Sequence, residues 1–129
     1  MAGELILIVE DNEKNRKLVR DVLAFKGYRL AEAETGEEGV RLARELRPAL
    51  ILMDIQLPGI SGIEALTQIR NHESTRAIPV MAVTASAMST DRSKIIAAGF
   101  DGYQAKPISV RPFLELVREV LDRPPRSGS

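Results

Sequence analysis

The sequence has no cysteine, and its net charge is zero. The absence of cysteine excludes disulfide bonds, thiol catalysis and cysteine-based zinc sites. Lys plus Arg and Asp plus Glu both number 18, a balance that argues against nucleic-acid or membrane-surface binding driven by bulk charge. No apolar run approaches the ~20 residues of a membrane-spanning helix, and the N-terminus lacks the pattern of a secretion signal. We therefore expect a cytoplasmic protein that neither binds nucleic acid nor inserts into a membrane.

The 129 residues, 44% of them apolar and 28% charged, are typical of one soluble globular domain. We predict a single domain over residues 1–122. We expect residues 123–129 to form a short mobile tail, with no room for an output domain.

Short apolar runs alternate along the chain with segments in which apolar residues recur at helical spacing. Strands that alternate with single helices predict a parallel sheet covered by helices on both faces. The three strongest runs show no polar alternation, which indicates strands buried on both sides. The sequence therefore predicts an α/β fold, a flavodoxin-like doubly wound sheet of five βα units. The expected strands are Leu5–Val9, Tyr28–Ala33, Leu50–Met53, Val80–Val83 and Phe100–Ala105.

Residues that begin or end helices agree with this pattern. Asn12 can cap the first helix, and Gly27 follows it. Pro48 closes the second helix, and Pro124–Pro125 stops the last. The segment Ser86–Ala98 has the least regular apolar spacing. In the first helix we expect a single apolar stripe made of Leu18, Val19, Val22, Leu23 and Phe25.

Polar residues follow the ends of four predicted strands. They are Glu10 and Asp11 after the first strand, Asp54 after the third, Thr84 after the fourth and Lys106 after the fifth. The carboxyl ends of parallel strands lie at one edge of the sheet, and ligands bind there where the strand order reverses. In the order 2-1-3-4-5 the first and third strands are neighbours and their acidic residues meet. Right-handed crossovers allow this order, although the sequence alone does not determine it.

The chemistry of these side chains indicates phosphoryl transfer. Three carboxylates repel one another unless a cation joins them. Oxygen ligands select a hard cation, and Mg²⁺ commonly binds one or two carboxylates together with phosphate oxygens and water. Lys106 adds a positive charge and Thr84 adds a hydroxyl donor. The set is that of a carboxylate nucleophile whose transferred phosphoryl group is neutralised by a metal and a lysine.

Each residue taken singly has a simpler explanation. The acidic residues and Thr84 could cap helices or turns, Lys106 could be a solvated surface lysine, and Tyr103 could be a core aromatic. The only histidine, His72, lies among polar residues at a helix end, and we expect it to be exposed and uninvolved. A cis peptide bond before Pro107 would aim the lysine inward, but its spacing alone leaves this open. Five suitable residues at strand ends favour the functional interpretation.

The same segments resemble a known family. Val9–Asn12, Leu52–Pro58, Val83–Ala85 and Lys106–Pro107 resemble, in order and spacing, the motifs of response-regulator receiver domains in two-component signalling. The resemblance extends from Leu5 to Leu121. It includes single-domain regulators of cell division and receivers attached to hybrid histidine kinases, and it implies the strand order 2-1-3-4-5.

This resemblance implies a role for each residue. Asp54 accepts a phosphoryl group from a phosphohistidine on a histidine kinase or phosphotransfer protein, and Lys106 pairs with the phosphoryl oxygens. Thr84 and Tyr103 form the conformational switch. The protein would catalyse only its own phosphorylation and dephosphorylation and would not otherwise be an enzyme. The implied Mg²⁺ ligands are Glu10, Asp11, Asp54 and the backbone carbonyl of Gln56.

The resemblance also implies interaction surfaces. The kinase or phosphotransfer helix would dock over the first helix, near Asn15 and Leu18. Glu10 stands where many relatives have aspartate, which leaves only the detail of metal coordination open. The surface that signals to a protein output partner would be formed by Ser86–Ala98, Phe100–Ala105 and Ser109–Leu121.

Three other functions fit parts of the pattern. Aspartyl-phosphate phosphatases usually carry a second aspartate two positions after the nucleophile, where this chain has Gln56. An FMN carrier needs a loop of Gly, Ser and Thr after the first strand, and here that loop is acidic. The main alternative is a receiver-like binding module that acts without phosphorylation, although its acidic residues would be expected to be incomplete.

Overall fold

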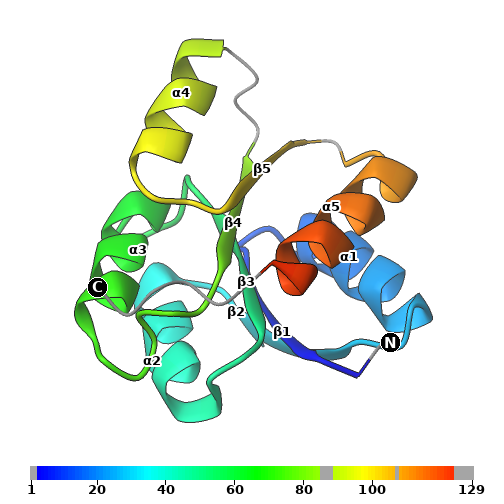
Figure 1. Ribbon diagram of the computed structural model, residues 1–129, viewed down its shortest axis with the longest axis horizontal. Helices are drawn as coiled ribbons and strands as arrows, with labels where there is room; N and C mark the ends of the chain where they lie inside the picture. Colours follow the sequence, from blue (N-terminus) through cyan, green and yellow to red (C-terminus); the bar gives the residue numbers. More distant parts are fainter. Residues whose placement is uncertain (1–2, 85–88, 107, 124–129) are drawn as a thin grey trace.

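The computed structural model describes residues 3–84, 89–106 and 108–123, with the backbone alone for residues 89–92. These residues form a five-stranded parallel sheet whose strand order is β2-β1-β3-β4-β5 (Figure 1). The predicted flavodoxin-like fold and its strand order are confirmed. The strands are β1 (Leu5–Val9), β2 (Arg29–Ala33), β3 (Leu50–Asp54), β4 (Val80–Thr84) and β5 (Gly102–Ala105). The helices are α1 (Glu13–Phe25), α2 (Gly36–Leu46), α3 (Gly62–Asn71), α4 (Ser89–Ala97) and α5 (Val110–Asp122).

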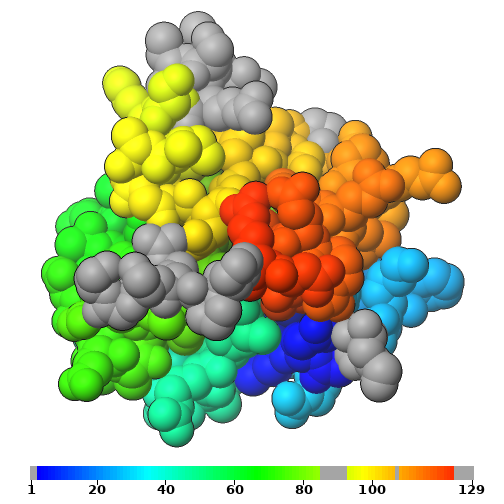
Figure 2. Space-filling model, viewed as in Figure 1, coloured from blue at the N-terminus to red at the C-terminus, as the bar shows by residue number. Residues whose placement is uncertain are grey.

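Helices cover both faces of the sheet and divide the core into two halves. Alternate residues of a strand point to opposite faces, so Ile6 and Ile8 of β1 pack with α1 and α5. Leu7 and Val9 pack on the other face, with α2, α3 and α4. Figure 1 shows these two helix layers on either side of the sheet. Figure 2, drawn from the same viewpoint, shows that side chains fill the gaps between the ribbons. Burial on both faces explains why the central strands read as unbroken apolar runs.

The outer strands are shorter than the sequence predicts. Tyr28 and Phe100 were both expected in strands, but β2 begins at Arg29 and β5 at Gly102. Both aromatic side chains nevertheless pack into the core, Tyr28 beside α1 and α5 and Phe100 on the opposite face. Phe100 follows Gly99, whose φ of 110° marks a turn that a side chain would strain. The apolar pattern therefore located these buried residues correctly but placed the first residue of each strand too early.

The buried stripe of α1 is narrower than predicted. Val19 and Leu23 are buried and Val22 is partly buried, whereas Leu18 is 44% exposed and Phe25 is 88% exposed. A helix lying on a sheet buries positions spaced by three or four residues, and Leu18 and Phe25 fall outside that stripe. The prediction that all five residues form a single stripe is therefore wrong for Leu18 and Phe25.

The ends of the helices follow the predicted signals. The Asn12 side chain accepts a hydrogen bond from the Asn15 amide at 3.0 Å, which caps α1, and Gly27 follows that helix with a φ of 90°. Helix α2 ends just before Pro48, with Arg47 in the left-handed conformation. His72 caps the C-terminus of α3 and is exposed, as expected. Residues after Arg123 lie outside the described part, so the mobile tail and the domain limits stay predictions.

No helix in the described residues is both long enough and apolar enough to cross a lipid bilayer.

An ion pair ties α3 to β4 and β5 at the edge of the sheet where these two strands begin. Arg70 donates to the carboxylate of Asp101 at 2.9 Å and to the carbonyl of Ile78 at 2.6 Å. The same carboxylate accepts the Val80 amide at 2.8 Å. Both charged side chains are less than one fifth exposed, at 17% and 13%. The Asp101 carboxylate, which is mostly buried, accepts hydrogen bonds from both Arg70 and the Val80 amide. It therefore connects the end of α3 to the starts of β4 and β5.

We expect Asp101→Ala to lower the free energy of unfolding by about 2 kcal/mol, because it leaves Arg70 and the Val80 amide without this acceptor. Urea denaturation followed by circular dichroism would measure the loss. Asp21→Ala is the control, since it removes only exposed ion pairs, with Lys17 and Arg20, and should leave the midpoint nearly unchanged. Equal midpoints for the two variants would contradict the prediction.

Candidate functional site

The strand order brings the polar strand ends to one edge of the sheet. Asp54 and Thr84 are the last residues of β3 and β4, while Glu10 directly follows β1 and Lys106 directly follows β5. Strand β1 lies beside β3, so Glu10 and Asp54 extend from neighbouring strands. The topology therefore assembles in space a group of residues that spans most of the sequence.

Three carboxylates and one ammonium group meet at this edge. Oxygens of Glu10, Asp11 and Asp54 all lie within 4.8 Å of one another. The Lys106 ammonium contacts Glu10 Oε1 at 2.5 Å and Asp54 Oδ2 at 3.0 Å. Glu10 and Asp54 are buried, whereas Asp11 is exposed. The site is thus closed by the sheet on one side and open to solvent beside Asp11.

The surroundings change the proton affinity of two of these groups. Burial raises the pKa of the Glu10 carboxyl, and the nearby charge of Asp54 adds to this effect. Burial by itself would lower the pKa of Lys106, but its hydrogen bonds to Glu10 and Asp54 outweigh burial and raise that pKa. Lys106 is therefore held in its charged form between two acidic groups.

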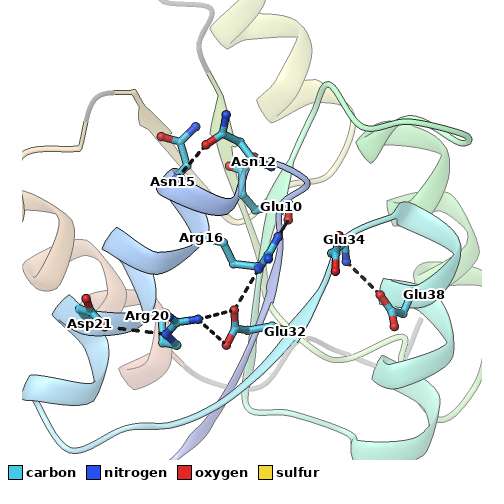
Figure 3. A network of polar contacts seen from close by, with 9 residues as sticks. All are labelled: Glu10, Asn12, Asn15, Arg16, Arg20, Asp21, Glu32, Glu34 and Glu38. Atoms are coloured by element: carbon cyan, nitrogen blue, oxygen red, sulfur yellow. Dashed lines mark hydrogen bonds and ion pairs between the residues drawn. The ribbon is translucent and has the colours of Figure 1, made fainter.

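Four contacts hold Glu10 in place. Its amide donates to the Ala33 carbonyl at 2.9 Å, and its Oε2 accepts the Asn12 amide at 3.1 Å. Its own carbonyl accepts Arg16 Nη1 at 2.9 Å (Figure 3), and Lys106 holds the remaining carboxylate oxygen. The backbone and the side chain of Glu10 are both fixed before any ligand binds.

Asp54 is held by its own loop and by the start of α3. Its Oδ1 accepts the Gln56 amide at 3.0 Å. The Gly62 amide donates to the Ile55 carbonyl at 2.9 Å, and a Cβ atom on Gly62 would clash with the Asp54 carbonyl oxygen and come within 2.8 Å of Ile55 Cα. Only glycine allows α3 to begin this close to the end of β3.

The other predicted site residues lie close to this group or outside the described residues. Thr84 is 1% exposed, and its carbonyl accepts the Lys106 amide at 2.8 Å. Tyr103 is half-buried on β5, where it pairs with Ala82 and packs toward α2, α3 and α4. The predicted cis bond before Pro107 lies outside the described residues. The roles of these residues stay predictions.

Sequence reasoning missed two groups that support the site. Arg16 was not singled out, because its partners Glu10 and Glu32 come from other elements and follow no local pattern. Gly62 was not recognised as a constrained position, although a glycine shortly after the strand end of Asp54 is a usable signal.

The donor set fits a magnesium ion. All three side chains offer carboxylate oxygens, the ligands that hard cations select, and the exposed side next to Asp11 leaves room for water or phosphate oxygens.

The chain is similar to a known protein family and to proteins and solved structures of known name. A family model described as the response regulator receiver domain matches residues 6–118. The chain belongs to this family. Receiver domains are signalling switches of two-component systems, not classical enzymes, and they interact in general with histidine kinases and output partners. The resemblance noted from the sequence motifs is confirmed.

Relatives of known name include single-domain regulators and kinase receivers. The polar-differentiation response regulator DivK of Brucella anthropi is 47% identical over 116 residues, covering 90% of this chain and 94% of that protein. The receiver domain of the sensor histidine kinase PA1611 from Pseudomonas aeruginosa PAO1 has 35% identity and a TM-score of 0.87. The superposition covers 95% of this chain and 100% of that domain, which was crystallised with a magnesium ion coordinated in its active-site cleft.

A CheY-like response regulator receiver domain protein from Methanospirillum hungatei JF-1 is also similar. It has 31% identity and a TM-score of 0.82, with 94% of this chain and 95% of that chain covered.

We expect Lys106→Met to lower the free energy of unfolding at pH 7.5 in EDTA by about 3 kcal/mol, because two buried carboxylates lose their shared cation. Thermal and urea denaturation would measure the loss. Saturating Mg²⁺ should recover part of it, since a divalent cation can again offset the charge of Glu10 and Asp54. Lys94→Met, on an exposed lysine of α4, is the control. A variant as stable as the wild type in EDTA would show that the ion pair contributes little.

Proposed function

We propose that this receiver domain is a Mg²⁺-dependent phosphorylation switch whose phospho-acceptor is Asp54. The observation that supports the proposal is the meeting of Glu10, Asp11 and Lys106 around the buried carboxylate of Asp54. A carboxylate surrounded by both acidic and cationic groups has the partners that phosphoryl transfer requires. The similarity to receiver domains of known name supports the same conclusion.

The proposed reaction moves a phosphoryl group from a phosphohistidine to Asp54. A carboxylate oxygen of Asp54 forms a bond to phosphorus while the phosphorus–nitrogen bond breaks, and the electron pair of that bond returns to the histidine ring. The Gln56 amide and Lys106 each hold one carboxylate oxygen, which orients the nucleophile. Lys106 can then donate to the oxygens of the transferred group.

The metal ligands in this proposal are Glu10, Asp11, Asp54 and the backbone carbonyl of Gln56. When bound, Mg²⁺ supplies charge neutralisation for the phosphoryl oxygens. The carboxylate of Asp11, which is the exposed one of the three, faces the open side by which a phosphodonor reaches the site. Hydrolysis would then break the bond between the Asp54 oxygen and phosphorus, with water as the nucleophile, and would release inorganic phosphate. The protein would thus catalyse only its own phosphorylation and dephosphorylation.

Thr84 and Tyr103 form the proposed switch. A phosphoryl group on Asp54 adds negative charge and strong acceptor oxygens beside the end of β4, where Thr84 lies. The Thr84 hydroxyl moves toward these oxygens, and the half-buried ring of Tyr103, which pairs with the neighbouring residue Ala82, moves into the space behind it. A local charge change thereby reaches the surface of β5.

The proposed partners are a histidine kinase or phosphotransfer protein and a protein that reads the output. The phosphodonor docks over α1 near Asn15 and Leu18, and the 44% exposure of Leu18 suits such a contact. Output leaves through α4, β5 and α5, where Ile96 and Val110 are each 48% exposed. The identity to DivK supports a part in polar differentiation. We also propose a role in cell-division regulation and a cytoplasmic location.

We expect acetyl phosphate to add a single phosphoryl group to the purified protein in the presence of Mg²⁺, measured by intact mass. Labelling should disappear in EDTA, because the cation that neutralises the phosphoryl oxygens is removed. It should also disappear in Asp54→Asn, because the carboxylate nucleophile is lost. Asp21→Asn, which changes an exposed aspartate of α1, should be labelled like the wild type.

A phosphorylated Asp54→Asn variant would refute Asp54 as the acceptor. No labelling of the wild type by acetyl phosphate or by a phosphorylated histidine phosphotransfer protein would favour a binding module that acts without phosphorylation.

We expect Thr84→Ala to be phosphorylated on Asp54 but to lose the coupling to Tyr103, because the hydroxyl that follows the phosphoryl group is absent. The measurement is the phosphorylation-dependent change in the ring resonances of Tyr103 in NMR spectra. Thr84→Ser, which keeps the hydroxyl, should retain the change. If Thr84→Ala shows the same shift of Tyr103 as the wild type, the switch does not pass through Thr84.

A further inference from the structure

Arg16 joins the acidic loop after β1 to the outer strand β2. Its side chain is 13% exposed and donates in two directions, from Nη1 to the Glu10 carbonyl at 2.9 Å and from Nε to Glu32 Oε1 at 3.0 Å (Figure 3). A guanidinium group is planar and has donors at fixed angles, so one side chain can bridge two acceptors in this way. Helix α1, the loop and β2 are thereby connected at a single point.

Glu32 anchors this bridge. It pairs with Ile8 in the sheet, so its position is set by the register of β1 and β2. Its carboxylate also accepts two hydrogen bonds from Arg20 Nη1, at 3.0 and 3.1 Å. Two arginines of α1 thus share one carboxylate. Of the two, only Arg16 also donates a hydrogen bond to the Glu10 carbonyl.

The hydrogen bond to the Glu10 carbonyl also orients the peptide group that joins Glu10 to Asp11. A peptide group is planar, so holding the carbonyl oxygen fixes the plane that also contains the Asp11 nitrogen and Cα. The Glu10 amide is already bonded to the Ala33 carbonyl at 2.9 Å. With both bonds made, the directions in which the Glu10 and Asp11 side chains leave the backbone are set.

We propose that Arg16 is a positioning residue for the metal site, which it serves by holding the Glu10–Asp11 peptide in the orientation that directs both carboxylates toward Asp54. The proposal rests on the Mg²⁺-dependent function proposed above. Arg16 is not among the proposed metal ligands; it acts through the backbone that carries two of them, Glu10 and Asp11. Groups that orient metal ligands commonly change the metal affinity by about ten- to a hundredfold when they are removed.

Two effects of removing Arg16 have opposite signs and can be separated. Loss of a positive charge near an acidic site would by itself strengthen the binding of a cation. Loss of the carbonyl contact would weaken binding, because the ligands are no longer held. Arg20 is a matched control: it carries the same charge on the same helix and bonds the same Glu32 carboxylate.

The experiment is a Mg²⁺ titration of the whole chain in wild type, Arg16→Met and Arg20→Met. The amide ¹H–¹⁵N chemical shifts of Asp11 and Gln56 are the readout. We expect Arg16→Met to raise the Mg²⁺ dissociation constant about tenfold. Arg20→Met should leave it unchanged or slightly lower. Thermal melting of each variant in EDTA shows whether it is folded before the titration begins.

Glu32→Gln is the second variant, in case Arg16→Met does not fold. It weakens the anchor of Arg16 without removing the arginine, and it is also expected to raise the dissociation constant, though by less. Unchanged Mg²⁺ affinity in folded Arg16→Met, or in Glu32→Gln if only that variant folds, would overturn the positioning role. An equal loss in Arg16→Met and Arg20→Met would overturn it as well. A wild type that binds no Mg²⁺ would instead overturn the proposed function on which the inference rests.

Discussion

The contact of one ammonium group with two buried carboxylates organises this molecule's functional edge. Lys106 follows β5, Glu10 follows β1 and Asp54 ends β3, so a single side chain joins three strands of the sheet. Both carboxylates are buried, and the ammonium group offsets their mutual repulsion. The ion pair therefore gives the buried Asp54 carboxylate a cationic partner inside the fold, and the neighbouring loops are arranged around it.

The parallel sheet makes that contact possible, and close backbone packing makes it tight. All five strands end at the same edge, and the reversal of strand order beside β1 leaves space above Glu10 and Asp54. Helix α3 begins directly against the end of β3 because Gly62 has no side chain. A bulkier residue there would push the helix away from the peptide that carries Asp54, so one glycine helps to set the shape of the site.

The sequence alone predicted the fold class and the strand-end residues, because both depend on local patterns. Unbroken apolar runs identified the central strands, and the residues after them formed the acidic group with Lys106. The strand order came from the family resemblance, since right-handed crossovers allow more than one arrangement. The exposed positions Leu18 and Phe25 were misassigned because helix rotation, not apolar content, decides which residues face the sheet. Arg16 was missed because its contacts exist only after the strands have paired.

The charges of the site suit the proposed phosphorylation switch and its divalent cation. Three carboxyl groups face one ammonium group, so acidic groups outnumber basic ones and a divalent cation would offset the excess. In the unphosphorylated protein Lys106 lies nearer to Glu10, at 2.5 Å, than to Asp54, at 3.0 Å. A phosphoryl group on Asp54 would add acceptor oxygens beside the Lys106 ammonium, to which the ammonium could donate. Because Arg16 and Asn12 hold Glu10 independently of Lys106, this proposed metal ligand would stay in place while the lysine donates to the phosphoryl oxygens.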